Sequence, residues 1–294
     1  MLEQPRIGFV GLGNMGTPMA GRLAAAGYRV TGTDLSADNR RALIDAGGTA
    51  VASAAEVAGA SDVLVLMLPS SDVVEAVLLR EGAAAALPEG ALVIDMSSSE
   101  PLRTRELAAR LAERGTELID APVSGGVKGA VAGSLTIMAG GDAELVERAR
   151  PVLEAMGKVV HTGPVASGHA LKAFNNLLSA THLLVTSEAV LAGKEFGLEP
   201  AVMLATINGS SGRSGSTENK WPNFILPESY DSGFALQLML KDMRIATGLA
   251  SALGMPSRLG ECAVELWGQA AEELPRTADH TEIARWLVSR THIG

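Results

Sequence analysis

A glycine-rich turn joins a short apolar strand to a helix near the start of this chain. The predicted strand, Arg6–Val10, runs directly into Gly11–Gly16, whose sequence GLGNMG has glycine at its first, third and sixth positions. A helical stretch, Thr17–Ala26, follows at once. This spacing permits a tight turn, a close approach of the backbone to a pyrophosphate, and close packing of the helix on the strand. The pattern therefore predicts a dinucleotide-binding βαβ unit, with the phosphates at the helix N-terminus.

An acidic residue ends the next predicted strand, Arg29–Thr33. Asp34 lies about 20 positions after the glycines, where a carboxylate binds the ribose 2′-hydroxyl in such units. A carboxylate there repels a 2′-phosphate, which favours NAD over NADP. Arg40 and Arg41 lie just downstream and could instead reach a phosphate, so NADP stays open as a second cofactor. Asp34 could also cap the helix that follows.

Apolar runs alternate with helical stretches through the first half of the chain. Continuous apolar runs are typical of strands covered on both faces, and the βαβ alternation predicts a mostly parallel sheet with helices on both sides. Ligands of such sheets bind beyond the carboxyl ends of the strands. The further predicted strands are Asp62–Leu68, Ala91–Asp95, Glu117–Asp120, Ser134–Ala139 and Val159–Val160, with helices that include Leu102–Arg114 and Ala143–Met156.

Helical periodicity replaces this alternation after Gly163-Pro164. We therefore predict an α/β fold in two domains, a dinucleotide-binding domain over 1–164 and an all-helical domain over 165–294. A long polar segment, Asn208–Asp231, is predicted to be a loop that covers a pocket or contacts a second subunit. The predicted helices of this half are Gly168–Gly197, Pro200–Asn208, Leu236–Leu253, Met255–Leu274 and Thr281–Ser289.

The long helix Gly168–Gly197 carries an unusual polar group. Apolar side chains lie almost all round it, so we expect it to be buried on most sides. Lys172, Asn175 and Asn176 sit together near its start, and their spacing places them on one face. Buried groups of this kind are costly unless they have partners or a task. We interpret them as facing a pocket in which the chemistry takes place.

A second polar turn follows the predicted strand Glu117–Asp120. The backbone N–H groups of Ser124, Gly125 and Gly126 can form a concave anion site, for which a small carboxylate is the natural guest. An ordinary flexible turn is the other interpretation of the same residues.

Composition argues against several classes of function. The chain has 294 residues, of which 47% are hydrophobic, enough for two domains with real cores. Its net charge is −9 and no segment is strongly basic, which argues against nucleic-acid binding. Cys262 is the only cysteine, and the histidines, which we interpret as structural or exposed, have no ligand spacing, so no metal site is predicted. With no room for a signal peptide before Arg6 and no apolar run of membrane length, we expect a soluble cytoplasmic protein.

Several motifs together resemble the β-hydroxyacid dehydrogenases, the group that contains 3-hydroxyisobutyrate dehydrogenase and tartronate semialdehyde reductase. The resemblance covers essentially the whole chain, with one departure at Ala166, where the family often has glycine before the catalytic helix. The motifs are GLGNMG at Gly11–Gly16, LP at Leu68-Pro69, DMSSSEP at Asp95–Pro101, DAPVSGG at Asp120–Gly126, KAFNN at Lys172–Asn176 and KD at Lys241-Asp242.

The resemblance implies a Rossmann-type domain followed by an all-α domain. It also implies a role for each motif. Lys172 and Asn176 are implied to be the catalytic pair. Ser124, Gly125, Gly126 and Asn175 are implied to bind the substrate. The implied cofactor-binding residues are Gly11, Leu12, Gly13, Asn14, Met15, Gly16, Asp34, Leu68, Pro69, Val73, Ser98 and Lys241.

The implied reaction is hydride transfer between a small 3-hydroxy acid, such as 3-hydroxyisobutyrate, and NAD. Oxidising an alcohol requires a base, and a lysine with its usual pKa of about 10.4 is a poor one unless burial lowers that pKa. Lys172 on an apolar helix is placed for this, and would act as the acid in the reverse direction. Asn176 would orient the hydroxyl group, and a carboxylate held at Ser124–Gly126 would fix which carbon reacts.

Three other readings compete with this one. Tartronate semialdehyde reduction would use the same site on a different substrate. Imine reduction uses a similar architecture, but those enzymes usually lack the lysine, so Lys172 argues against it. A non-enzymatic cofactor sensor would need no proton-transfer group. The resemblance also implies a homodimer or homotetramer assembled through the helical domain.

Overall fold

The computed structural model of the protein describes residues 4–255 and 257–291. Contacts within the chain define two compact units, Met1–Lys172 and Ala173–Gly294. The division falls inside one continuous helix, α9 (Ser167–Glu195). The domain boundary predicted after residue 164 precedes this helix and stays a prediction.

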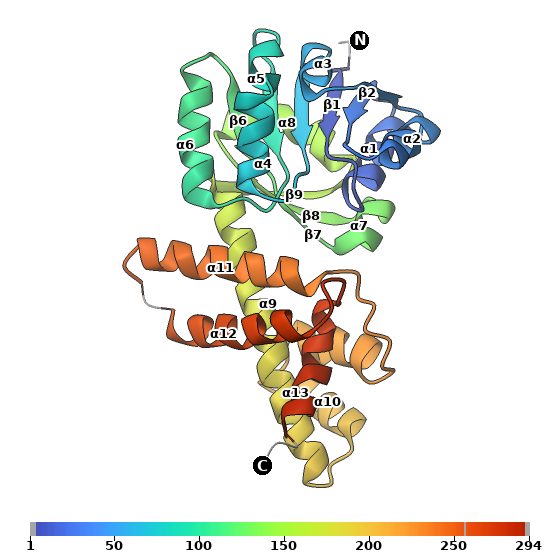
Figure 1. Ribbon diagram of the computed structural model, residues 1–294, viewed down its shortest axis with the longest axis vertical. Helices are drawn as coiled ribbons and strands as arrows, with labels where there is room; N and C mark the ends of the chain where they lie inside the picture. Colours follow the sequence, from blue (N-terminus) through green and yellow to red (C-terminus); the bar gives the residue numbers. More distant parts are fainter. Residues whose placement is uncertain (1–3, 256, 292–294) are drawn as a thin grey trace. The chain divides into compact units, whose positions relative to one another are not determined.

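The first unit is built on a sheet that is parallel over most of its width (Figure 1). Its strands are β1 (Ile7–Val10), β2 (Val30–Thr33), β3 (Thr49–Ala50), β4 (Val63–Leu66), β5 (Leu92–Asp95), β6 (Glu117–Asp120), β7 (Val123–Ser124), β8 (Leu135–Gly140) and β9 (Gly157–Gly163). In the described part of the chain their order is β3-β2-β1-β4-β5-β6-β8-β7, with β9 beside β8. Strands β1 to β6 run parallel, whereas β8 runs antiparallel to β6 and β7. The predicted fold class is confirmed.

Alternate residues of each central strand enter different cores, which explains their continuous apolar sequences. Val63 and Val65 of β4 pack into one cluster with Phe9, while Leu64 and Leu66 pack into a second cluster on the other face. Burying side chains of this size stabilises the fold by about 1.5–3 kcal/mol each. The helices that cover the two faces are α1 (Gly16–Ala25), α2 (Ala37–Asp45), α3 (Ala54–Gly59), α4 (Ser71–Glu75, continued by a π-helical turn Ala76–Arg80), α5 (Ala83–Ala86), α6 (Pro101–Ala112), α7 (Gly126–Ala132) and α8 (Ala143–Glu154).

The second unit is helical, as predicted. Its core is centred on the fully buried Trp267 and includes Leu183 of α9 and Trp221. Helices α11 and α12 pack side by side and antiparallel (Figure 1). After α9, the helices are α10 (Pro200–Asn208), a π-helical segment Ser216–Ile225, α11 (Leu236–Ala252), α12 (Arg258–Glu273), a 3₁₀ turn His280–Glu282 and α13 (Ile283–Thr291).

Two expectations about this unit are wrong. The segment Asn208–Asp231 is not simply a polar loop, because its π-helical part buries Trp221, whose indole N–H donates to Ser187 Oγ at 3.2 Å. Nor is α9 buried on most sides. Leu178 and Val185 are 59% and 54% exposed, so an apolar stripe of α9 remains uncovered in the single chain.

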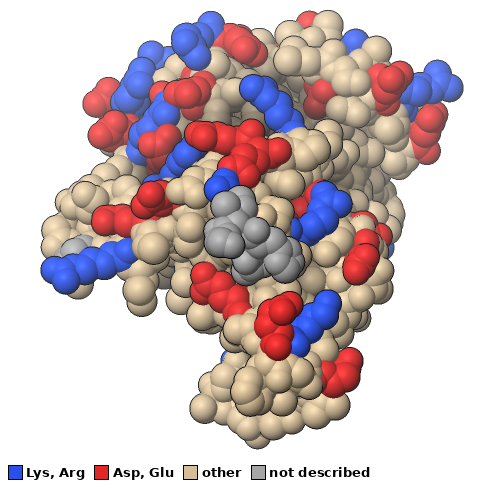
Figure 2. Space-filling view, turned by 60° about the horizontal axis from the view of Figure 1, so that its bottom comes forward, with Lys and Arg blue, Asp and Glu red and all other residues tan. Residues whose placement is uncertain are grey.

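The surface is mixed in charge. On the face drawn in Figure 2, acidic and basic side chains are interspersed over the surface. Within the described residues, none of the helices combines the length and apolar character that crossing a membrane requires.

Candidate active site

The three motif glycines at the end of β1 each serve a different purpose. Gly11 has φ of +94°, and a Cβ there would overlap the carbonyl oxygen of Met67. A Cβ at Gly16 would overlap the carbonyl oxygen of Gly11, so α1 could not begin so close to the turn. Among the described residues, nothing lies within 4 Å of the corresponding position at Gly13, which leaves its backbone open. This is the shape that a pyrophosphate-binding turn requires, and the side chain of Met15, the N-cap residue of α1, makes no capping hydrogen bond.

Asp34 ties this turn to the end of β2. One carboxylate oxygen accepts the N–H of Leu12 at 2.7 Å, and the other accepts the N–H of Ser36 at 2.8 Å and Asn39 Nδ2 at 3.1 Å. The cap of α2 is Ser36, whose hydroxyl accepts the N–H of Asn39, so Asp34 does not itself cap that helix. Its carboxylate is instead fixed beside the glycine turn.

The segments after β4 and β5 lie together at the same edge of the sheet. The N–H of Leu68 donates to Ser97 Oγ at 2.9 Å, which joins the two segments directly. Pro69 is exposed, whereas Leu68, Val73 and Ser98 are half-buried. The structure thus brings Leu68, Pro69 and Ser98 to the segments that follow neighbouring strand ends, where a cofactor of a parallel sheet would lie, while Val73 lies in the helix that follows, α4.

The Ser124–Gly126 turn has the backbone shape of an anion site. Ser124 ends β7, where it pairs with Thr136 of β8. Gly125 and Gly126 then take φ values of +131° and +62°, which L side chains rarely adopt. The Cβ position of Gly126 faces open space among the described residues. The corresponding position at Gly125 lies 3.2 Å from Leu135 Cδ2, so the open side of the turn is at Gly126.

The polar residues of α9 divide by burial. Lys172 is 8% exposed and Asn176, one turn further on, is 5% exposed. Asn175 is exposed, and its Nδ2 donates to Asn176 Oδ1 at 3.1 Å. The expectation that all three share one buried face therefore holds for Lys172 and Asn176 alone. The substrate-binding role of Asn175 stays a prediction.

A buried carboxylate orients the amide of Asn176. Asn176 Nδ2 donates to Asp242 Oδ2 at 2.6 Å, and Asp242 is 2% exposed. Because a carboxylate only accepts, this contact fixes which end of the amide is the donor. Lys241 Nζ lies 3.5 Å from Asp242 Oδ1. The sequence predicted a role for Lys241 and none for Asp242. The signal that could have identified Asp242 is its negative charge within the otherwise apolar sequence of α11.

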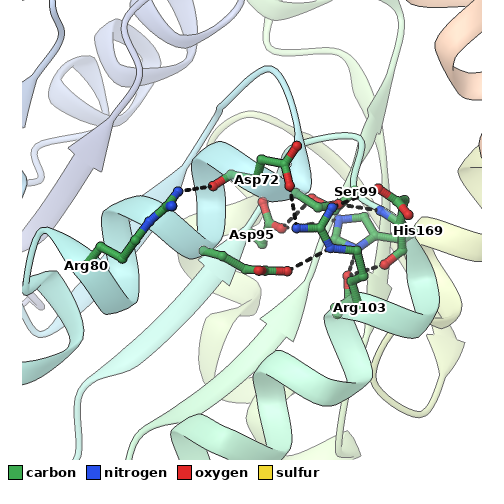
Figure 3. Close-up of polar contacts among 10 residues, drawn as sticks. Asp72, Arg80, Asp95, Ser99, Arg103 and His169 are labelled. Atoms are coloured by element: carbon green, nitrogen blue, oxygen red, sulfur yellow. Dashed lines mark hydrogen bonds and ion pairs between the residues drawn. The ribbon is translucent and has the colours of Figure 1, made fainter.

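A second buried polar cluster lies at the start of α9. His169 is 1% exposed and sits beside two buried carboxylates, with Nε2 3.7 Å from Asp95 Oδ2 and Nδ1 3.8 Å from Asp120 Oδ2. Figure 3 shows Asp95, Ser99 and His169 gathered beside Arg103. Burial raises the pKa of the Asp120 carboxyl group, an effect opposed by His169 and by two backbone N–H donors. The sequence indicated only that His169 is structural or exposed. His292 lies outside the described residues.

Two family descriptions match adjoining parts of the chain. The NAD binding domain of 6-phosphogluconate dehydrogenase matches residues 6–163. The NAD-binding region of NADP-dependent 3-hydroxyisobutyrate dehydrogenase matches residues 166–287.

Similar proteins align over nearly the full length. The chain is 40% identical over 270 residues to an NAD-dependent L-serine dehydrogenase of Pseudomonas aeruginosa, covering 89% of this chain and 91% of that protein. It is 38% identical over 275 residues to a 3-hydroxyisobutyrate dehydrogenase of the same species, covering 90% and 92%. A solved structure of Mycobacterium tuberculosis 3-hydroxyisobutyrate dehydrogenase with L-serine matches with a TM-score of 0.92 at 32% identity, covering 97% and 99% of the two chains.

Proposed function

Because the chain belongs to the β-hydroxyacid dehydrogenase family and is an NAD(P)-dependent oxidoreductase, we propose that it oxidises 3-hydroxypropionates with a small substituent at C2. The names of its relatives support this class. L-serine and 3-hydroxyisobutyrate share a carboxylate, a primary alcohol at C3 and a small group at C2, which is an amine in one and a methyl in the other. The alternative substrate, tartronate semialdehyde, is the aldehyde of the analogue with a hydroxyl at C2.

The observation that carries the proposal is the buried lysine of α9 with an oriented amide one turn away. Lys172 and Asn176 are both almost fully buried, and Asp242 holds the amide of Asn176 with its N–H groups as the donors. One of those N–H groups is used by Asp242, so the other can donate to a substrate oxygen. A proton-transfer group and an oxygen-orienting donor therefore lie on one helix.

The proposed chemistry removes a proton and a hydride from the alcohol, leaving an aldehyde. When bound, the nicotinamide cofactor supplies the hydride acceptor. The neutral amine of Lys172 accepts the hydroxyl proton, and in the reverse direction its ammonium form returns the proton to the carbonyl oxygen. Asn176 donates an N–H to that oxygen, and the backbone of Ser124–Gly126 binds the carboxylate and fixes the reacting carbon.

The contacts of Asp34 support NAD as the preferred cofactor. Its carboxylate is held in place by two backbone N–H groups and by Asn39, so it cannot easily swing away from a 2′-phosphate. Arg40 donates to the carbonyl oxygens of Asp34 and Leu35, and Arg41 pairs with Asp45 at 3.1 Å. Both arginines are therefore engaged in contacts within the chain.

The exposed stripe of α9 supports a homo-oligomer. Leu171, Leu178 and Val185 are spaced seven residues apart and are 45%, 59% and 54% exposed. A seven-residue apolar repeat on one helix face is the pattern that packs against another helix. A second copy of this chain is the proposed occupant. Whether two or four copies assemble, and whether the location is cytoplasmic, stay predictions from the sequence.

The test is NAD and NADP reduction by the purified protein with 3-hydroxyisobutyrate, L-serine, D-glycerate and 3-hydroxypropionate. We expect turnover with NAD that collapses in Lys172→Ala, while NAD binding measured by fluorescence stays within twofold. Lys194→Ala, at the far end of α9, is the matched control and should keep full activity. Activity that survives Lys172→Ala would contradict the catalytic assignment, and the absence of turnover on every acid would contradict the substrate class.

A further inference from the structure

The first turn of α9 is anchored by a residue far away in the sequence. We propose that Asp120 is a positioning residue for Lys172, acting by fixing the start of α9 to the strand that leads into the Ser124–Gly126 turn. This proposal rests on the function proposed above. Asp120 would touch neither substrate nor cofactor and would act through the lysine.

Asp120 caps the helix from the end of β6. One carboxylate oxygen accepts the N–H of Ala166 at 2.5 Å, and the other accepts the N–H of His169 at 2.7 Å. These are backbone N–H groups of the kind that the first turn of a helix leaves without intrahelical partners. The two bonds fix the position of this turn along and around the axis of α9. Lys172 follows His169 by three residues and is carried by the same part of the helix.

The approach of the helix to Asp120 is so close that two neighbours must be glycine. A Cβ at Gly140 would lie 2.5 Å from Asp120 Oδ1 and 2.8 Å from the backbone nitrogen of Gly168. A Cβ at Gly168 would overlap the carbonyl oxygen of Met138 and lie 2.9 Å from Asp120 Oδ2. The side chain of Asp120 is fully buried. The contact is therefore direct and tightly packed.

The side chain of His169 joins the same turn to helix α6. Thr104 Oγ1 donates to the carbonyl oxygen of Glu100, and Nδ1 of the His169 imidazole lies 2.9 Å from the same hydroxyl oxygen. Nε2 of His169 lies 3.7 Å from Asp95 Oδ2, which is beyond hydrogen-bond distance. Asp95 is itself held by the N–H of Ser97 and the hydroxyl of Ser99. The start of α9 is thus fixed to the end of β6 through Asp120 and contacts α6 through His169.

The consequence for catalysis follows from where Asp120 lies in the chain. It is four residues before Ser124, and its carboxylate holds the turn of Lys172. One side chain therefore connects the proposed carboxylate-binding turn to the proposed base. Errors of about 1 Å in such a separation can cost on the order of 100-fold in rate.

The test uses Asp120→Asn, which keeps the size of the side chain but leaves only one oxygen to accept two N–H groups. We expect amide exchange in the peptide 164–173 to become at least tenfold faster, and acetylation of Lys172, read by mass spectrometry, to rise severalfold. Exchange in the peptide 5–20 and acetylation of Lys194 should stay unchanged. Neither readout requires activity, so both still test the anchor if no 3-hydroxy acid proves to be a substrate.

Kinetics then separate positioning from a general structural role. We expect Asp120→Asn to lower kcat at least tenfold while the Kd for NAD stays within twofold. In the Lys172→Ala background, with ethylamine added to restore measurable turnover, Asp120→Asn should cause no further loss. Equal losses in both backgrounds, or unchanged exchange and acetylation, would overturn the proposal.

Two further variants guard against simple loss of folding. Gly140→Ala pushes on the same carboxylate without removing charge, and should reproduce the kcat loss if Asp120→Asn is unstable. Asp142→Asn removes a carboxylate that caps α8 in the same unit, where it accepts the N–H of Glu144 at 2.9 Å. It should lower stability and leave kcat unchanged. A kcat loss in Asp142→Asn equal to that of Asp120→Asn would also overturn the proposal.

Discussion

Asn176 Nδ2 lies 2.6 Å from Oδ2 of Asp242, and both side chains are buried. Asp242→Asn would replace an oxygen that only accepts by an amide that can rotate, so the amide of Asn176 would no longer be held in one orientation. We expect kcat to fall by about 10- to 100-fold with the proposed 3-hydroxy acid, which corresponds to about 1.4–2.7 kcal/mol of transition-state stabilisation. Steady-state kinetics with NAD held at saturation would measure this.

Asp231→Asn is the control for that experiment, because Asp231 is an exposed carboxylate of the same unit whose partner is Ser229. Its kcat should match that of the unaltered protein. An Asp242→Asn variant with full kcat would show that the orientation of Asn176 does not limit the reaction.

Asp34 is the residue on which cofactor preference should depend. Asp34→Ser removes the negative charge and leaves a hydroxyl that can still accept one N–H. We expect the Kd for NAD to rise about tenfold and the NAD-to-NADP preference to fall by 10-fold or more, because the repulsion of a 2′-phosphate is lost. Titration with both cofactors would measure the ratio. Asp38→Ser, in the first turn of α2, is the control, and an unchanged ratio in Asp34→Ser would contradict the assignment.

Most of the fold could be predicted because its signals are local. Every strand predicted from an apolar run is present with ends within three residues, since a run bounded by turn residues defines a buried strand wherever it occurs. Strands β3 and β7 were missed because two residues each carry no pattern. The π-helical segment around Trp221 was missed because its polar composition and Pro222 indicate a loop.

Residues of the candidate site could be proposed from the sequence only where a motif is contiguous. Gly11–Gly16, Ser124–Gly126 and Lys172 belong to such motifs. The contact of Asn176 with Asp242 joins residues 66 apart, and that of His169 with Asp120 joins residues 49 apart. Such pairings depend on how elements pack, and a single sequence contains no signal that links their members.

Ala166 should be a correctable point of strain. It is buried with φ of +75°, a conformation that costs a residue with a Cβ about 1 kcal/mol or more. Ala166→Gly should therefore raise the free energy of unfolding by about 0.5–1 kcal/mol, since the strain relieved exceeds the small loss of buried area. Chemical denaturation would measure it. Ala170→Gly, within the helix, should instead lower the free energy of unfolding by about 1 kcal/mol. A loss of stability in both variants would contradict the argument.

His280 should make the protein less stable in mild acid. Burial lowers the pKa of His280 from 6.5 to about 4, and the charge of Lys220 adds to this effect. The unfolded chain therefore takes up a proton that the folded chain does not. The contribution of neutral His280 to the free energy of unfolding is fully present above pH 6.5 and is lost as the pH falls from 6.5 to 4. The loss is up to about 1.4 kcal/mol per pH unit and about 3 kcal/mol in all.

His280→Gln isolates this contribution, because glutamine does not titrate. The free energy of unfolding, measured between pH 4.5 and 7.5, should fall less steeply with acid in the variant than in the unaltered protein. Parallel curves for the two proteins would show that His280 is not the titrating group.

The stripe Leu171, Leu178 and Val185 on α9 should hold copies of the chain together. Leu178→Glu introduces a charge at its centre, where burial against a second copy would leave that charge without a partner. We expect the mass in solution, measured by light scattering at micromolar concentration, to fall to 30.3 kDa, that of one chain. Ile44→Glu, at an apolar position of α2 that is 47% exposed, is the control and should leave the mass unchanged. An oligomer that persists in Leu178→Glu would mean that the copies meet through a different surface.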